Sequence, residues 1–77
     1  MSKISATIDV RIYEPRDKRP AIFKTFEELS SGETMELIND HHPRPLYDHF
    51  NVEIPNQFEW EYLEEGPELW RIGITKK

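Results

Sequence analysis

Thr7-Ile8-Asp9-Val10-Arg11-Ile12, together with Ala21-Ile22-Phe23-Lys24-Thr25-Phe26-Glu27-Glu28-Leu29, decides the class of fold. Apolar and polar residues alternate in the first stretch, which predicts a half-buried strand over residues 7–12. In the second stretch the apolar residues recur at helical spacing, which predicts an amphipathic helix. We expect Asp17 to cap this helix, Pro20 to lie in its first turn and Gly32 to follow its end. A strand that leads into a helix opens a βαβ unit.

The remaining elements complete the order βαβαββ. Residues 33–39 predict a second, better-buried strand, and a short second helix with Pro45 in its first turn begins near Leu46. Residues 58–62 and 70–74 alternate on either side of a Gly-Pro turn, which predicts a hairpin. Its aromatic side chains, Trp60 and Trp70 included, are then core residues. The sequence therefore predicts an α+β two-layer sandwich, with a mixed four-stranded sheet, both helices on one face and a charged, solvated outer face.

Composition limits what the chain can be. With 77 residues we expect one domain over residues 1–77. The absence of cysteine excludes disulfides, thiolate metal sites and persulfide chemistry. The net charge of −5 argues against general nucleic-acid binding. No apolar run reaches the length of a membrane span and no signal-peptide core follows the first residues, so we expect a cytoplasmic monomer that does not bind membranes.

Charge and proline gather in the two loops that follow the first two strands. Residues 1–24 hold six Lys and Arg against three acids, whereas residues 25–77 hold four against twelve. If both crossovers are right-handed, the two loops lie at the same end of the sheet, where open sheets tend to bind ligands. The predicted ligand-binding residues are Arg11, Arg16, Arg19, Asp40, His41 and His42. The alternative is that these cations only balance the acidic remainder of the surface.

The three histidines offer a second type of site. Asp40, His42 and His49 form a candidate metal-ligand set, because imidazole and carboxylate bind zinc, nickel or iron. A metal or haem is thus a candidate cofactor, although the sequence requires none. The alternative is structural: Asp40 or Asn39 caps the second helix and a histidine packs against the hairpin aromatics. We find no nucleophile to complete an acid–base site, which favours a protein that is not an enzyme.

Several motifs resemble a family of small bacterial domains, the domain of unknown function 2249. They are Ile8-Asp9-Val10-Arg11, Gly32-Glu33-Thr34-Met35-Glu36-Leu37, Asn39-Asp40-His41-His42-Pro43-Arg44-Pro45-Leu46, Phe58-Glu59-Trp60-Glu61-Tyr62 and Gly66-Pro67-Glu68-Leu69-Trp70. That family is similar in fold to the TusA/SirA sulfur carriers, which implies the same βαβαββ sandwich. The carriers use a cysteine at the start of the first helix, where this chain has Asp17, Lys18, Arg19 and Pro20. A persulfide relay on this chain is therefore excluded.

The leading hypothesis is a small non-enzymatic module that binds an unidentified ligand or protein partner at the two loops. Relatives that accompany hemerythrin-like and other metal or redox domains imply an accessory role to such proteins. The alternatives are a metal- or haem-binding protein that uses the Asp-His-His-Pro loop, and a docking partner in sulfur transfer that carries no sulfur itself.

Overall fold

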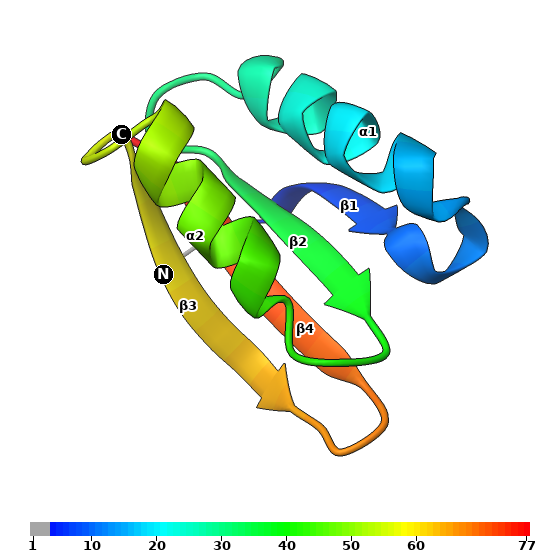
Figure 1. The fold of residues 1–77 in the computed structure, drawn as a ribbon. Helices are drawn as coiled ribbons and strands as arrows, with labels where there is room; N and C mark the ends of the chain where they lie inside the picture. The colour runs from blue at the N-terminus through cyan, green and yellow to red at the C-terminus, as the bar shows by residue number, and fades with distance from the viewer. Residues whose placement is uncertain (1–3) are drawn as a thin grey trace.

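The computed structural model describes residues 4–77. Residues 1–3, which precede the segment where we expect no signal-peptide core, lie outside the described residues. Strands and helices alternate before the final hairpin (Figure 1). The elements are β1 (Ile4–Asp9), the 3-10 helix η1 (Val10–Ile12), α1 (Pro15–Glu27), β2 (Thr34–Asn39), α2 (Arg44–Glu53), β3 (Phe58–Glu65) and β4 (Trp70–Lys76). The predicted order βαβαββ is confirmed.

The four strands form one mixed sheet in the order β1-β2-β4-β3. Strands β1 and β2 pair in parallel, as a helical crossover requires, and β4 pairs antiparallel with both β2 and β3. The second crossover, through α2, therefore brings β3 parallel to β2 but leaves room for β4 between them. Because β4 lies inside the sheet, its central residues Ile72 and Ile74 are fully buried.

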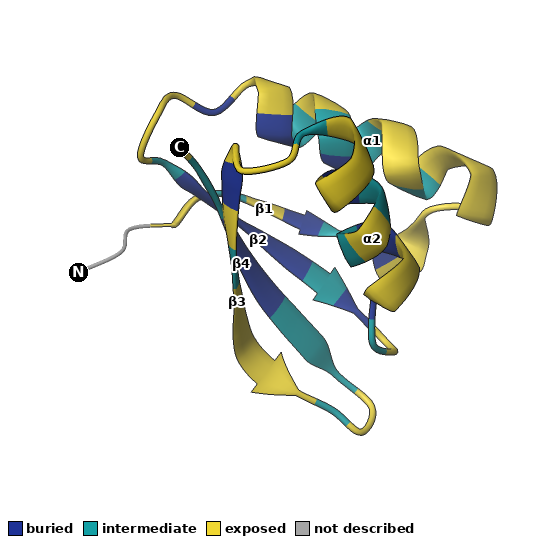
Figure 2. Ribbon diagram, turned by 60° about the vertical axis from the view of Figure 1, so that its left-hand side comes forward, coloured by how far each residue is buried: buried dark blue, intermediate teal, exposed yellow. Residues whose placement is uncertain are grey.

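Both helices lie on one face of the sheet, and the core fills the space between the two layers (Figures 1 and 2). The buried apolar residues come from every helix and strand and form one cluster: Ile8, Val10, Ile22, Phe26, Leu29, Met35, Leu37, Leu46, Phe50, Phe58, Ile72 and Ile74. The predicted α+β two-layer sandwich is thus confirmed. Within residues 4–77, no helix combines the length and apolar composition needed to cross a membrane.

The first strand is shorter than the alternation predicts. It ends at Asp9, whose side-chain Oδ1 accepts the backbone N–H of Arg11 at 3.0 Å and caps a short 3-10 turn. Val10 still reaches the core, but it does so from this turn, and Ile12 is 81% exposed. The prediction of a strand over residues 7–12 is therefore wrong in its second half, because a local side-chain hydrogen bond replaces strand pairing.

The first helix begins earlier than predicted. It starts at Pro15 after the N-cap residue Glu14, so Asp17 lies in the first turn and is not the cap, and Pro20 lies inside the helix. Proline is preferred at the first helical position, and Pro15 satisfies this preference where we had assigned it to Pro20. The prediction for the helix end is wrong in its position. Gly32 has φ +90°, the left-handed conformation that favours glycine, but α1 already ends at Glu27 with Glu28 as its C-cap residue, so Gly32 lies in the turn before β2.

The outer face of the sheet is charged, as predicted, but its centre is not solvated. Glu36 is only 8% exposed. Its carboxylate accepts hydrogen bonds from Arg71 Nε at 2.5 Å and from the Thr7 hydroxyl at 3.2 Å. On the same face, Leu63 of β3 lies beside Gly73 of β4. A partly buried ion pair therefore occupies the middle of a face that lacks a covering helix.

A candidate ligand pocket between two loops

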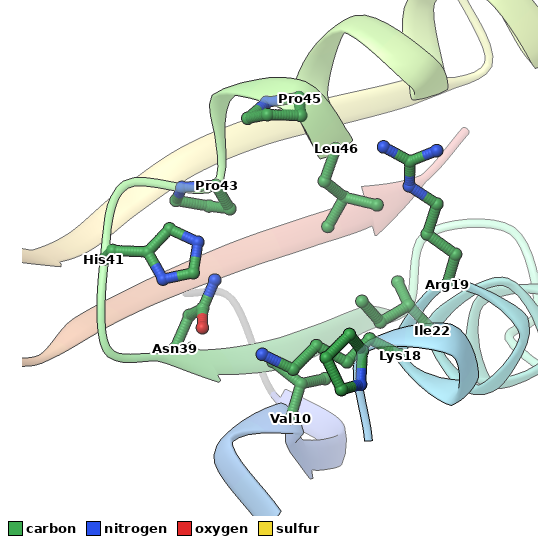
Figure 3. Close-up of a pocket in the computed structure, with 10 residues that line it drawn as sticks. Val10, Lys18, Arg19, Ile22, Asn39, His41, Pro43, Pro45 and Leu46 are labelled. Carbon is green, nitrogen blue, oxygen red and sulfur yellow. The ribbon is translucent and has the colours of Figure 1, made fainter. Parts of the chain in front are cut away.

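A pocket of about 360 Å³ lies where the loop and turn after β1 meet the loop after β2 (Figure 3). We call it the junction pocket and define it by its lining residues: Val10, Pro15, Lys18, Arg19, Ile22, Asn39, His41, Pro43, Pro45 and Leu46. Because β1 and β2 are parallel, their carboxyl ends share one edge of the sheet. The two loops thus meet at one end of the sheet, as the sequence predicts.

The floor of the junction pocket is apolar. Val10 is brought there by the 3-10 turn, Ile22 by α1 and Leu46 by the first turn of α2, and all three are buried. The two lining prolines at the helix starts, Pro15 and Pro45, have no backbone N–H to offer a ligand. The pocket therefore offers an apolar surface with fewer backbone donors at the helix starts.

Four polar side chains line the pocket. Lys18 and Arg19 extend from α1, Asn39 is the last residue of β2, and His41 comes from the loop after β2 (Figure 3). Asn39 is buried, and its Oδ1 accepts the backbone N–H of Asp40 at 2.9 Å. Within residues 4–77 the Nδ2 group of Asn39 donates no hydrogen bond, so this amide remains available as a neutral donor.

The arginine of the pocket differs from the other arginines in its surroundings. Four arginines form ion pairs with carboxylates: Arg11 with Asp9, Arg16 with Glu14, Arg44 with Asp48 and Arg71 with Glu36. In the described part of the chain, Arg19 is the one arginine without such a pair. Lys18 has no carboxylate partner either, as is true of the other lysines there. Two unpaired positive charges thus flank an apolar pocket.

The structure divides the predicted basic residues between the pocket and the surface. Of Arg11, Arg16 and Arg19, only Arg19 lines the pocket. Arg11 binds Asp9 through Nε at 2.9 Å and Nη2 at 2.7 Å. These hydrogen bonds hold the pKa of the Asp9 carboxyl below its usual value and raise that of the Arg11 guanidinium. Arg16 has 84% of its side chain exposed and lies 3.4 Å from Glu14.

Asp40, the acidic residue among the predicted ligand-binding residues, contacts His41 and does not line the pocket. Asp40 is exposed and its carboxylate lies 2.7 Å from Nδ1 of His41, the histidine that lines the pocket. This hydrogen bond lowers the pKa of the Asp40 carboxyl, and the positive charge of Lys18 adds to the effect. Asp40 therefore orients the His41 ring at the pocket and does not itself line it.

His42 and His49 lie away from the pocket. His42 Nε2 lies 2.7 Å from the Tyr62 hydroxyl, and its ring packs on Trp70 with centroids 4.9 Å apart. This is the structural alternative that we considered, a histidine against the hairpin aromatics. The other half of that alternative is wrong, because neither Asp40 nor Asn39 caps α2: its N-cap residue is Pro43, without a side-chain cap.

Each of the three candidate metal ligands, Asp40, His42 and His49, contacts a different residue. Asp40 contacts His41 and His42 contacts Tyr62. His49 packs edge-on against Phe23 and lies 3.7 Å from Glu53 on its own helix. Across residues 4–77, no three His, Cys, Asp or Glu side chains gather closely enough to hold a metal ion.

Sequence reasoning missed most of the pocket lining, although one signal was present. Pro15, Lys18, Arg19 and Ile22 occur at i, i+3, i+4 and i+7, which is one face of a helix. Arg16 is off that face. The same spacing analysis that identified the core residues of α1 could therefore have separated Arg19 from Arg16. The sequence pattern gave no indication that Asn39 lines the pocket, because its burial depends on the position of the loop after β2.

The family comparison covers both loops of the pocket. The family model described as "Uncharacterized conserved protein (DUF2249)" matches residues 7–76. No curated protein and no solved structure matches the chain. Since the matched segment includes every residue that lines the junction pocket, the resemblance seen in the sequence motifs extends over the whole site. The chain belongs to the DUF2249 family of uncharacterized conserved proteins.

Proposed function

We propose that the chain is a non-enzymatic module that binds a small ligand in the junction pocket. The observation that carries this proposal is the presence of two unpaired cations, Lys18 and Arg19, beside an apolar floor. Cations that are paired with carboxylates would only balance the acidic remainder of the surface. Unpaired cations at a pocket instead keep their hydrogen-bond donors free for a bound molecule.

The lining residues support binding rather than catalysis. The described residues contribute no hydroxyl, thiol or carboxylate to the pocket, so its lining has no oxygen or sulfur nucleophile and no carboxylate base. His41 is the remaining candidate for proton transfer, and its Nδ1 is engaged by Asp40 at 2.7 Å. Because Nδ1 donates its hydrogen to the Asp40 carboxylate, the Nε2 atom of the neutral ring can only accept a hydrogen bond.

A fragment screen tests the proposal. The ¹⁵N-labelled protein is titrated with a library of small carboxylates, amides, amines and apolar rings, and backbone amide shifts are recorded. We expect one or more fragments to shift the amides of Val10, Asn39 and Leu46 together and to saturate, because these residues line one pocket. If no fragment shifts this group of amides at millimolar concentration, the proposal is wrong.

A matched pair of variants shows whether the fragments occupy the pocket. Pro45 and Pro55 are both exposed prolines near the ends of α2, but only Pro45 lines the pocket. Pro45→Trp introduces a large ring at the pocket and is expected to abolish the fragment shifts, whereas Pro55→Trp should leave them unchanged. Loss of the shifts in both variants would place the binding elsewhere.

A further inference from the structure

The ligand class can be narrowed from the pocket itself, and this step rests on the function proposed above. A volume of about 360 Å³ is small for a ligand site. One water occupies about 30 Å³ of liquid, so the pocket holds a molecule of about a dozen non-hydrogen atoms. A single ring or a short branched chain fits this volume.

The floor specifies the body of the ligand. Val10, Ile22 and Leu46 are at most 7% exposed, and they present only carbon to the pocket. An apolar body that covers them removes both surfaces from water, which is the main favourable contribution to binding a small molecule at such a site. A fully polar ligand would lose hydration there without gaining hydrogen bonds.

The rim specifies the charge. Lys18 and Arg19 have no carboxylate partner among residues 4–77, and Asn39 Nδ2 adds a neutral donor. A phosphate group needs many converging donors, which helix N-termini usually provide through backbone N–H groups. Here Pro15 and Pro45 each remove one such donor from the starts of the two helices that face the pocket. A singly charged carboxylate needs fewer donors than a phosphate does, and the forked N–H groups of the Arg19 guanidinium can bind it alone.

We propose that the junction pocket binds a small carboxylate with an apolar body, such as an aromatic or branched-chain acid. In this arrangement the carboxylate contacts Arg19, and the apolar body lies on the floor formed by Val10, Ile22 and Leu46. The Lys18 ammonium lies on the opposite side of the pocket, beside Val10 and Asn39 (Figure 3), and adds positive charge without a direct contact. Figure 3 shows Arg19 reaching toward Leu46, which brings the guanidinium to the edge of the apolar floor.

Four probes of matched size or charge test the class of ligand. Benzoate, its neutral analogue benzamide, cationic benzylamine and inorganic phosphate are each titrated into the full chain, with backbone amide shifts as the readout. We expect benzoate to bind about tenfold more tightly than benzamide, because one charge-assisted hydrogen bond is worth about that ratio. Benzylamine and phosphate should give no saturating shifts at Val10, Asn39 and Leu46.

Two arginine variants provide the internal control. Arg19→Gln is expected to weaken benzoate binding about tenfold and to leave benzamide binding unchanged, while Arg16→Gln should change neither. Arg16 belongs to the same helix, but it points to Glu14 and does not line the pocket. A loss of benzoate binding in both variants would mean that the general charge of the helix, and not the pocket, attracts the anion.

The outcomes separate the ligand class from the proposed function. Equal binding of benzoate and benzamide, or tighter binding of benzylamine, overturns the carboxylate and leaves the pocket as a binding site. Saturating shifts with phosphate that exceed those with benzoate also overturn it, in favour of a phosphate ligand. If none of the four probes and no fragment of the screen shifts these amides, the proposed function fails as well.

Discussion

Arg16 and Arg19 lie less than one helical turn apart, yet their side chains have different surroundings. Arg19 lines the junction pocket without a carboxylate partner in the described residues, whereas Arg16 is paired with Glu14. The difference follows from helical phase, because Arg19 shares a face with Pro15, Lys18 and Ile22 and Arg16 does not. Side-chain chemistry alone could not distinguish them, and so the sequence assigned both to one site.

Arg71 is the residue on which the buried Glu36 depends. It donates to Glu36 at 2.5 Å, while Glu36 is 8% exposed. We expect Arg71→Leu to lower the free energy of unfolding by about 2–3 kcal/mol, because it leaves a buried carboxylate without its charged partner. Urea denaturation monitored by tryptophan fluorescence measures the change.

Two further variants identify the cause of that loss. Glu64 also lies near Arg71, at 3.8 Å, but it is exposed, so Glu64→Gln should change the stability by less than about 0.5 kcal/mol. The double variant Glu36→Leu with Arg71→Leu should recover most of the loss, since it removes both charges. If the double variant is as unstable as Arg71→Leu alone, packing and not charge explains the effect.

Asp9 makes part of the stability depend on pH. Hydrogen bonds from Arg11 lower the pKa of its carboxyl in the folded protein below the usual value of 3.8. A group of this kind contributes stability above its unfolded pKa, and the contribution is lost as the pH falls through the folded pKa. We expect Asp9→Asn to be less stable than the parent at about pH 7 and equally stable at about pH 2, as measured by thermal unfolding.

An alanine variant separates the charge from the cap. Asp9→Asn removes the charge but keeps an Oδ1 that can accept the N–H of Arg11, whereas Asp9→Ala removes both. Asp9→Ala should therefore be less stable than Asp9→Asn, by an amount that does not depend on pH. A difference between the parent and Asp9→Asn that is constant from neutral to acid pH would show that the carboxylate charge does not contribute.

At the scale of elements, α1 contains an internal proline. Pro20 is the sixth residue of the helix, so it removes the N–H that would bond the carbonyl of Arg16. We expect Pro20→Ala to raise the free energy of unfolding by about 1–2 kcal/mol. Removing the interior proline restores a hydrogen bond and stabilises the helix, whereas alanine gives the unfolded chain more conformational entropy and offsets part of this gain. The midpoint of urea denaturation measures this change.

Pro15 provides the control, because proline is tolerated at the first helical position. Pro15→Ala should therefore be neutral or slightly destabilising. If Pro20→Ala gives no gain, the helix accommodates the proline without the loss of a hydrogen bond, and the account of α1 is wrong.

The sequence predicted the number, type and order of the elements because each has a clear period. Residues 22–29 have helical spacing and residues 33–39 have the composition of a strand, and both elements are confirmed, although α1 ends at Glu27 and β2 begins at Thr34. Boundaries failed where a single hydrogen bond or a second proline changed the outcome, as at Asp9 and at Pro15. At such a boundary, a side-chain hydrogen bond or a proline competes with the regular backbone hydrogen bonds, and the two arrangements are close in energy. Hydrophobic periodicity does not show which arrangement forms.

At the scale of the whole molecule, topology creates the junction pocket. The parallel pairing of β1 and β2 places both loops at one edge of the sheet, which the right-handed crossover rule allowed us to predict. The sequence could not provide the strand order, since the second crossover fixes only the direction of β3 and leaves the position of β4 open. It also could not provide the pocket floor, because Val10, Ile22 and Leu46 read as ordinary core residues.

The most direct test of the account is the position of a bound carboxylate. The methyl groups of Val10, Ile22 and Leu46 come from three different elements and meet only at the junction pocket. With benzoate at saturating concentration, we predict intermolecular nuclear Overhauser effects from its ring protons to all three residues. Contacts to the methyl groups of Val52 or Leu63, which lie on the exposed surface, without contacts to these three would contradict the account.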